Sequence, residues 1–175
     1  MGLKKRISCG ILAIALSLQL ASPVDSYAGY FSDVTGHWAE FHINKVYNEK
    51  IISGYPDGRF RPDKAVTRAE FVAMVNETFE LDHIENNEAI NFTDVSYASW
   101  YYNAVSIAIA SAYAGGYSDN TFRPNSPINR QEAMVMLSRL VPAGKKDGNL
   151  KSFPDYRSVA SWATEAIAKM NGKGY

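Results

Sequence analysis

Phe31-Ser32-Asp33-Val34 recurs in the chain as Phe92-Thr93-Asp94-Val95 and again as Phe153-Pro154-Asp155-Tyr156. The step between copies is 61 residues both times, from position 31 to 92 and from 92 to 153. The three tryptophans of the sequence repeat with a step of 62 residues: Trp38, Trp100 and Trp162. A fixed period of this length is the signature of a repeat protein.

The positions that follow each tryptophan keep the 62-residue step. They pair as Gly54-Tyr55 with Gly116-Tyr117, Phe60-Arg61-Pro62 with Phe122-Arg123-Pro124, and Thr67-Arg68-Ala69-Glu70 with Asn129-Arg130-Gln131-Glu132. The third copy reaches only its first helix before Tyr175. We therefore predict a leader at 1–28, repeats at 29–89 and 90–151, and an incomplete third repeat at 152–175.

Each repeat is predicted to be a helix, a turn and a second helix. After Trp38 the apolar residues Ile43, Val46 and Tyr47 recur at helical spacing. Tyr55-Pro56-Asp57-Gly58 is a turn signal, and Pro62 should keep Arg61 in extended geometry. The sequence predicts an all-α fold in which the repeats must pack on one another to bury their apolar faces.

The second helix of each repeat should begin with a capping box, in which a cap side chain and a glutamate each accept a backbone N–H. Thr67 and Glu70 form this pattern in the first repeat, and Asn129 and Glu132 form it in the second. Because the third repeat lacks a second helix in this sequence, we expect the helix after Trp162 to have the fewest partners.

The N-terminus resembles a secretory signal. Lys4, Lys5 and Arg6 precede the mostly apolar stretch 7–20, and Ser26-Tyr27-Ala28 offers a cleavage site. The apolar stretch is shorter than the roughly 20 residues of a membrane-spanning helix. We expect cleavage after Ala28, which also removes Cys9, the single cysteine of the sequence.

Composition and motifs argue against several function classes. The formal net charge is zero, which argues against a broad basic surface for nucleic acid. The three histidines show no metal-ligand or triad-like arrangement, and carboxylates such as Glu40 and Glu49 show no spacing typical of a glycosidase. We expect no enzyme activity, no cofactor and no metal.

The motifs Phe-x-Asp-Val, Trp, Gly-Tyr-x-Asp-Gly-x-Phe-x-Pro and Thr-Arg-Ala-Glu, in this order and spacing, resemble the S-layer homology (SLH) domain. The resemblance covers essentially all of residues 31–175. It implies a pseudo-threefold helical body that anchors an exported protein to the bacterial cell wall or S-layer. It also implies binding of secondary cell wall polysaccharide in grooves between repeats, commonly through a pyruvate ketal.

Several residues of the sequence have the chemistry to bind such a ligand. Arg68 and Arg130 each take the first position of a capped helix, where a guanidinium can hold a carboxylate in a two-pronged contact. The other candidate ligand residues are Ser53, Gly54, Tyr55, Gly116, Tyr117, Trp38, Trp100 and Trp162. A repeated tryptophan at a helix start is equally consistent with a packing role and with stacking on a sugar ring.

The expected partner is thus secondary cell wall polysaccharide, with no nucleic acid and no membrane span once the leader is removed. Two alternatives stay open at this stage. The repeats could form a structural S-layer or protein-interaction module, or they could be the anchor of a longer exported enzyme. The oligomeric state is not determined by the sequence.

Overall fold

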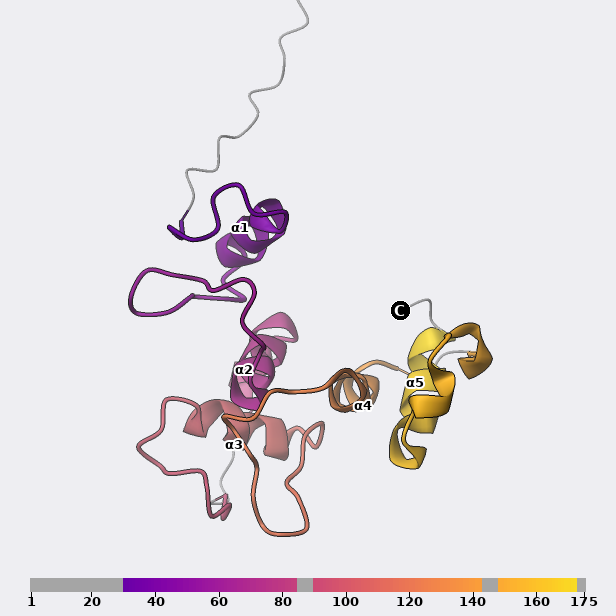
Figure 1. Ribbon diagram of the computed structural model, residues 1–175. Coiled ribbons are helices and arrows are strands. Elements are labelled where there is room, and N and C mark those ends of the chain that lie inside the picture. The colour runs from indigo at the N-terminus through magenta and orange to yellow at the C-terminus, as the bar shows by residue number, and fades with distance from the viewer. Residues whose placement is uncertain (1–29, 85–89, 143–147, 173–175) are drawn as a thin grey trace, which may run out of the picture.

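The computed structural model describes residues 30–84, 90–142 and 148–172, and in these ranges helices are joined by long turns and loops (Figure 1). The α-helices are α1 (Glu40–Asn48), α2 (Arg68–Thr78), α3 (Tyr102–Ala110), α4 (Arg130–Leu140) and α5 (Thr164–Asn171). Short 3-10 turns are η1 (Leu81–His83), η2 (Leu150–Ser152), η3 (Tyr156–Ser158) and η4 (Ser161–Ala163). An isolated bridge between Thr67 and Pro127 is the one β-type pairing in the described ranges.

The expected all-α fold is confirmed, and the predicted first and second helices of each repeat are found. The leader and its cleavage site lie outside the described residues, and the pseudo-threefold arrangement stays a prediction.

The helices pair across the repeat boundaries. The second helix of the first repeat, α2, packs on α3, the first helix of the second repeat; in the same way α4 packs on α5. Figure 1 shows α1 set apart from both pairs, and no described helix packs on it to a similar extent. The expectation that the helix after Trp162 has the fewest partners is therefore wrong: α4 covers α5, whereas among the described residues no helix covers α1 to a similar extent.

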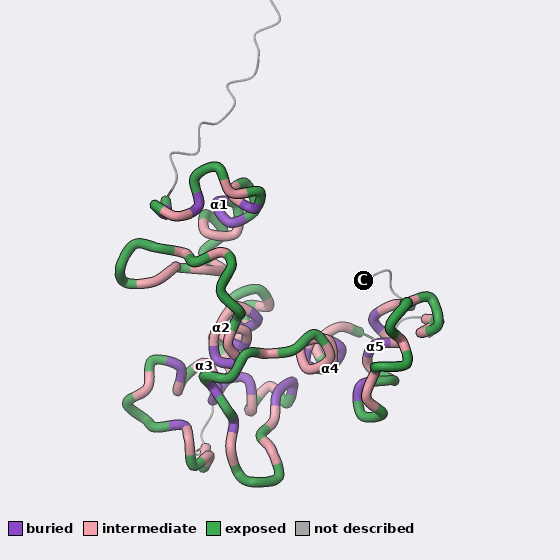
Figure 2. The backbone as a smooth tube through the Cα atoms, in the orientation of Figure 1, coloured by how far each residue is buried: buried purple, intermediate pink, exposed green. Residues whose placement is uncertain are grey.

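The buried residues form two apolar clusters, and Figure 2 shows buried stretches of backbone both in α1 and around α2, α3 and α4. The larger one joins α2, α3 and α4, and its fully buried side chains include Val72, Val105, Tyr113 and Phe122. The smaller one lies within the first repeat, where α1 closes over its own N-terminal loop; its buried members are Phe31, Val34, Ala39 and Ile43. The first half of repeat 1 thus has a separate, small core.

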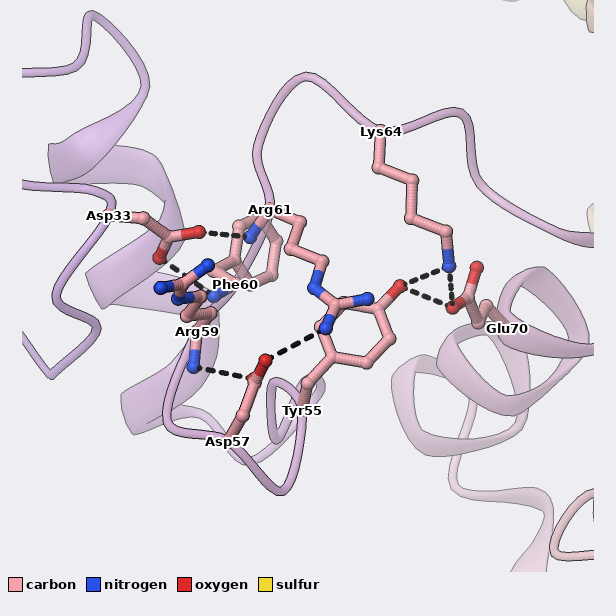
Figure 3. A network of polar contacts seen from close by, with 8 residues as sticks. All are labelled: Asp33, Tyr55, Asp57, Arg59, Phe60, Arg61, Lys64 and Glu70. Atoms are coloured by element: carbon pink, nitrogen blue, oxygen red, sulfur yellow. Dashed lines mark hydrogen bonds and ion pairs between the residues drawn. The ribbon is translucent and has the colours of Figure 1, made fainter.

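A carboxylate ties the two loops of each complete repeat together. Asp33 accepts the backbone N–H groups of Phe60 and Arg61 at 2.9 and 2.7 Å (Figure 3). Arg61 takes a positive φ of 59°, so the extended geometry expected before Pro62 is wrong. This left-handed backbone is held in place by the Asp33 contacts. Asp94 repeats the pattern in the second repeat, with Phe122 and Arg123 at 2.8 and 2.7 Å.

Candidate binding site at the repeat boundaries

Both second helices begin with the predicted capping boxes. Thr67 Oγ1 accepts the Glu70 N–H at 3.2 Å, and Glu70 Oε2 accepts the Thr67 N–H at 2.8 Å. Asn129 and Glu132 make the same reciprocal pair at 2.9 and 3.1 Å. The caps fix the backbone in front of Arg68 and Arg130, so each arginine is placed at the first turn of a helix.

Arg68 points into the second repeat rather than into solvent. Its Nη2 donates to the carbonyl of Gly115 at 2.7 Å, and its Nη1 lies 3.7 Å from Glu132 Oε1. The guanidinium also lies over the Tyr117 ring, 5.2 Å from its centroid. Only 8% of the side chain is exposed, and this burial lowers the pKa of Arg68. Arg68 therefore acts as a contact between repeats.

The N-terminus of α2 is also closed by the second repeat. The N–H of Arg68 donates to Ser126 O, and the N–H of Ala69 donates to Pro124 O, both at 2.9 Å. Together with the capping box, these bonds use the N–H groups that an anion would need. The position that the sequence predicted for an anion at Arg68 is thus taken by backbone carbonyls of the chain itself.

Arg130, its counterpart one repeat later, is in a different setting. The side chain is exposed, and no described residue forms a hydrogen bond or ion pair with it. Within the described ranges, the backbone N–H groups of Arg130 and Gln131 also lack a partner. The start of α4 thus keeps the free donors and the positive helix end that favour an anion.

A groove of about 420 Å³ opens beside this helix start, between α4 and the third repeat. Its lining combines the first two turns of α4, the loop before α5 and one residue of α5: Asn129, Arg130, Gln131, Met134, Phe153, Asp155, Ser158, Val159 and Ile167. The apolar members offer a surface for a sugar ring, while Arg130 offers a positive charge. Asp155 also lines the groove, and its carboxylate disfavours a second negative charge at that end of the groove.

Gln131 holds this groove together. Its amide oxygen accepts the Ala160 N–H at 2.8 Å, and its amide nitrogen donates to Ser158 O at 3.2 Å. The sequence analysis missed this role. The sequence signal that could have indicated it is the replacement of Ala69 of repeat 1 by Gln131, whose amide has both a hydrogen-bond donor and an acceptor.

The glycines of the Gly-Tyr turns have a packing reason. A Cβ added to Gly54 would lie 2.2 Å from the Phe31 ring, and one added to Gly116 would lie 2.1 Å from the Phe92 ring. Gly54 also has a φ of 72°, which disfavours other residues. The turn glycines therefore let the Phe-x-Asp-Val ring of the same repeat approach the backbone.

Tyr55 lies in a polar network in repeat 1 (Figure 3). Its hydroxyl donates to Glu70 at 2.5 Å and accepts from Lys64 Nζ at 2.7 Å, and Lys64 also lies 3.2 Å from Glu70. Burial raises the pKa of Glu70, but hydrogen bonds from Tyr55, Thr67 and Lys64 outweigh it and lower the pKa to about 2. Tyr117 donates to Glu132 in the same way in repeat 2.

Arg61 and Arg123 lie over the Tyr55 and Tyr117 rings in the same way in both repeats, but the second cation near each tyrosine and its glutamate has a different origin. In repeat 1 this second cation is Lys64, whose Nζ lies 4.7 Å from the Tyr55 ring centroid. In repeat 2 the position of Lys64 is held by Ser126, and Arg68 arrives from the preceding repeat instead. Sequence reasoning missed this exchange, since Lys64 belongs to no repeated motif.

The tryptophans are not core residues. Trp38, Trp100 and Trp162 are 84%, 66% and 57% exposed. Each stands beside the first helix of its repeat, at the surface, and none lines the groove at α4. Ser53 is likewise exposed. The structure therefore brings Arg130 and the loop before α5 together, and leaves the tryptophans and Ser53 outside that groove.

Comparison with known proteins fits this repeat-by-repeat construction. The S-layer homology domain matches residues 30–72 and again residues 91–134, one match for each complete repeat. The chain belongs to the S-layer homology family. This match confirms the family resemblance of the sequence motifs. The SLH domain is a non-catalytic anchoring module.

Relatives of the chain include surface proteins and enzymes. It is 32% identical to the cellulosome-anchoring protein of Acetivibrio thermocellus, over 90% of this chain and 37% of that protein. It is 32% identical to the amylopullulanase of Thermoanaerobacterium thermosulfurigenes, over 81% of this chain and 8% of the enzyme. It is 30% identical to the surface-layer 125 kDa protein of Lysinibacillus sphaericus, over 81% of this chain and 12% of that protein.

The chain therefore spans much less than half the length of these relatives. Membership confirms the expected location at the cell surface. None of the helices in the described part of the chain is long and apolar enough to cross a bilayer.

Proposed function

We propose that this chain is a non-catalytic module that anchors an exported protein to the cell wall by binding an anionic, pyruvylated secondary cell wall polysaccharide. The observation that carries the proposal is the setting of Arg130. A guanidinium without a protein partner in the described chain stands at the open start of α4, beside a groove with apolar walls. A sugar that carries a fixed carboxylate matches both features.

The two repeat arginines then have different roles. Arg68 holds the first two repeats together, because its donors are turned to Gly115 and Glu132. Arg130 is the residue available to a ligand carboxylate. The exposed tryptophans extend the sugar-binding surface outside the groove, with one flat apolar face beside the first helix of each repeat.

Co-sedimentation with cell wall sacculi tests the proposal. The exported chain, Gly29 to Tyr175, should pellet with intact sacculi and stay in solution once the wall polysaccharide has been removed. Binding that survives removal of the polysaccharide would favour a protein or peptidoglycan partner and contradict the proposal.

Calorimetry with a wall fragment tests the residue assignment. Replacing Arg130 by Ala should weaken binding of a pyruvylated fragment about ten- to a hundredfold, the usual loss for a charge-assisted pair. Lys at this position should restore part of the affinity, since it keeps the charge without the two-pronged geometry. Arg59→Ala, which removes the same charge from an exposed turn of repeat 1, is the matched control and should bind normally.

A further inference from the structure

The segment that precedes α5 has a near-copy one repeat earlier. Residues 158–162 read Ser-Val-Ala-Ser-Trp, and residues 96–100 read Ser-Tyr-Ala-Ser-Trp. Each copy leads into the first helix of its repeat, and only the second residue differs between them. A difference in how the two segments are held must therefore come mainly from the residues around them.

The two copies differ in the partner of the alanine N–H. In the earlier copy, the Ala98 N–H donates to the hydroxyl of Ser96 at 3.3 Å, so the turn closes on itself. In the later copy, the Ala160 N–H donates to Gln131 Oε1 at 2.8 Å, and Gln131 Nε2 donates to Ser158 O at 3.2 Å. The amide of Gln131 thus replaces the serine hydroxyl and ties the segment to α4.

The two bonds of Gln131 fall on either side of Val159. An amide that accepts on one side of a residue and donates on the other makes the pair of bonds that a neighbouring strand would make. Val159 accordingly has extended dihedrals, with φ −72° and ψ 122°, and it is half-buried in the lining of the groove. Its counterpart Tyr97, which lacks this clamp, is 84% exposed.

A single substitution between the repeats separates the two cases. The counterpart of Gln131 in repeat 1 is Ala69, which is fully buried and has no polar side-chain atom. Among the described side chains of α4, Gln131 makes both of the hydrogen bonds to residues 158–160. The wall that Ser158 and Val159 give to the groove is therefore held to α4 through one amide.

We propose that Gln131 is a positioning residue for sugar binding: its amide holds residues 158–160 so that the wall of the groove is in place before the ligand arrives. The proposal rests on the proposed function, because it concerns the same groove. Arg130 and Gln131 then have separate tasks in one helical turn. Arg130 binds the carboxylate, while Gln131 positions the wall that contacts the sugar, which lowers the conformational entropy lost on binding.

Gln131→Ala places in repeat 2 the residue that repeat 1 has. Ser158 then stands as Ser96 does, and its hydroxyl is expected to take the N–H of Ala160. The free energy of unfolding should therefore change little, while the Ala160 amide exchanges faster with solvent. The Ala98 amide is an internal control and should be unchanged. Gln131→Met, which keeps the length without the amide, should behave in the same way.

NMR titration with two wall fragments separates the tasks of the two residues. One fragment carries the pyruvate ketal, and the other is the same saccharide without it. Gln131→Ala and Gln131→Met should weaken binding of both fragments by the same factor, about three- to tenfold, as expected for neutral hydrogen bonds. Arg130→Ala should weaken binding of the pyruvylated fragment alone. The ratio of the two affinities is thus kept in the Gln131 variants and lost in Arg130→Ala.

Four results would overturn the role of Gln131. They are unchanged exchange at Ala160 in Gln131→Ala, unchanged affinity of that variant for both fragments, a natural chain that binds only the pyruvylated fragment, and a loss of folding stability as large as the loss of affinity. In each case the proposed function stands if the natural chain binds the pyruvylated fragment and Arg130→Ala weakens that binding. A natural chain that binds neither fragment would overturn the proposed function together with this role.

Discussion

Gly54 illustrates how a single repeated residue is fixed by two constraints at once. Its φ is positive, and the space where a side chain would begin is filled by Phe31. Gly58 shares the positive φ of 75° but has nothing within 4 Å of its missing Cβ. A comparison of substitutions at Gly54 and Gly58 therefore separates the free-energy cost of backbone strain from that of a steric clash.

Gly58→Ala should therefore lower the free energy of unfolding by about 1–2 kcal/mol, the typical cost of a left-handed backbone for a residue with a Cβ. Gly54→Ala should cost clearly more, because the Phe31 ring must also move within the small core of repeat 1. Urea denaturation of both variants measures the difference. Equal losses would show that the Phe31 contact adds nothing.

Glu70 predicts a dependence of stability on pH. Its pKa in the folded chain is about 2, below the ordinary value of 4.5, so its carboxylate stabilises the fold above pH 4.5. This contribution should be lost as the pH falls from about 4.5 to 2. Unfolding followed across that range should show a shallower decline for Glu70→Gln than for the natural chain, while exposed Glu77→Gln should follow the natural profile. Identical profiles for all three chains would contradict the prediction.

At the scale of elements, the sequence predicted local contacts but not contacts between residues far apart in the chain. The capping boxes at Thr67 and Asn129 could be predicted because each involves residues three positions apart. The environment of Arg68 could not, because its main acceptor, Gly115, lies 47 residues away and meets it only when α2 packs on α3. The sequence similarity of the two repeats therefore predicted where both helices begin, but not that their first-turn arginines differ in exposure.

Arg68 and Arg130 should accordingly separate stability from binding. Arg68→Ala removes a charged hydrogen bond and a stacked contact from a buried boundary, and we expect a loss of about 1.5–3 kcal/mol in the free energy of unfolding. Arg130→Ala should leave that free energy nearly unchanged, since the side chain is exposed. Thermal and urea unfolding measure both variants. A silent Arg68→Ala would return Arg68 to the set of surface charges that a ligand can reach.

At the scale of the whole molecule, the repeat sequence predicted the number and order of helices but not which of them would pack together. Pairing across the boundary gives α3 and α5 a partner from the preceding repeat, and α1 has no preceding repeat in this sequence. The main core accordingly begins at α2, and α1 is supported by its own loop. Apolar spacing identified which residues face inward, but it carried no information about which repeat would cover them.

Hydrogen exchange should follow this division. Amides of α3 lie next to Val105 and Ala108, which are fully buried, so their exchange should be the slowest of the first helices. Those of α5 should come next, because α4 covers that helix, and those of α1 should exchange fastest. Ile43→Ala, in the small cluster, should speed exchange in α1 and leave α3 unchanged, while Val105→Ala should speed exchange in α2 and α3. Equal protection of α1 and α3 would mean that the two clusters unfold as one unit, and that α1 is held by contacts other than helix pairing.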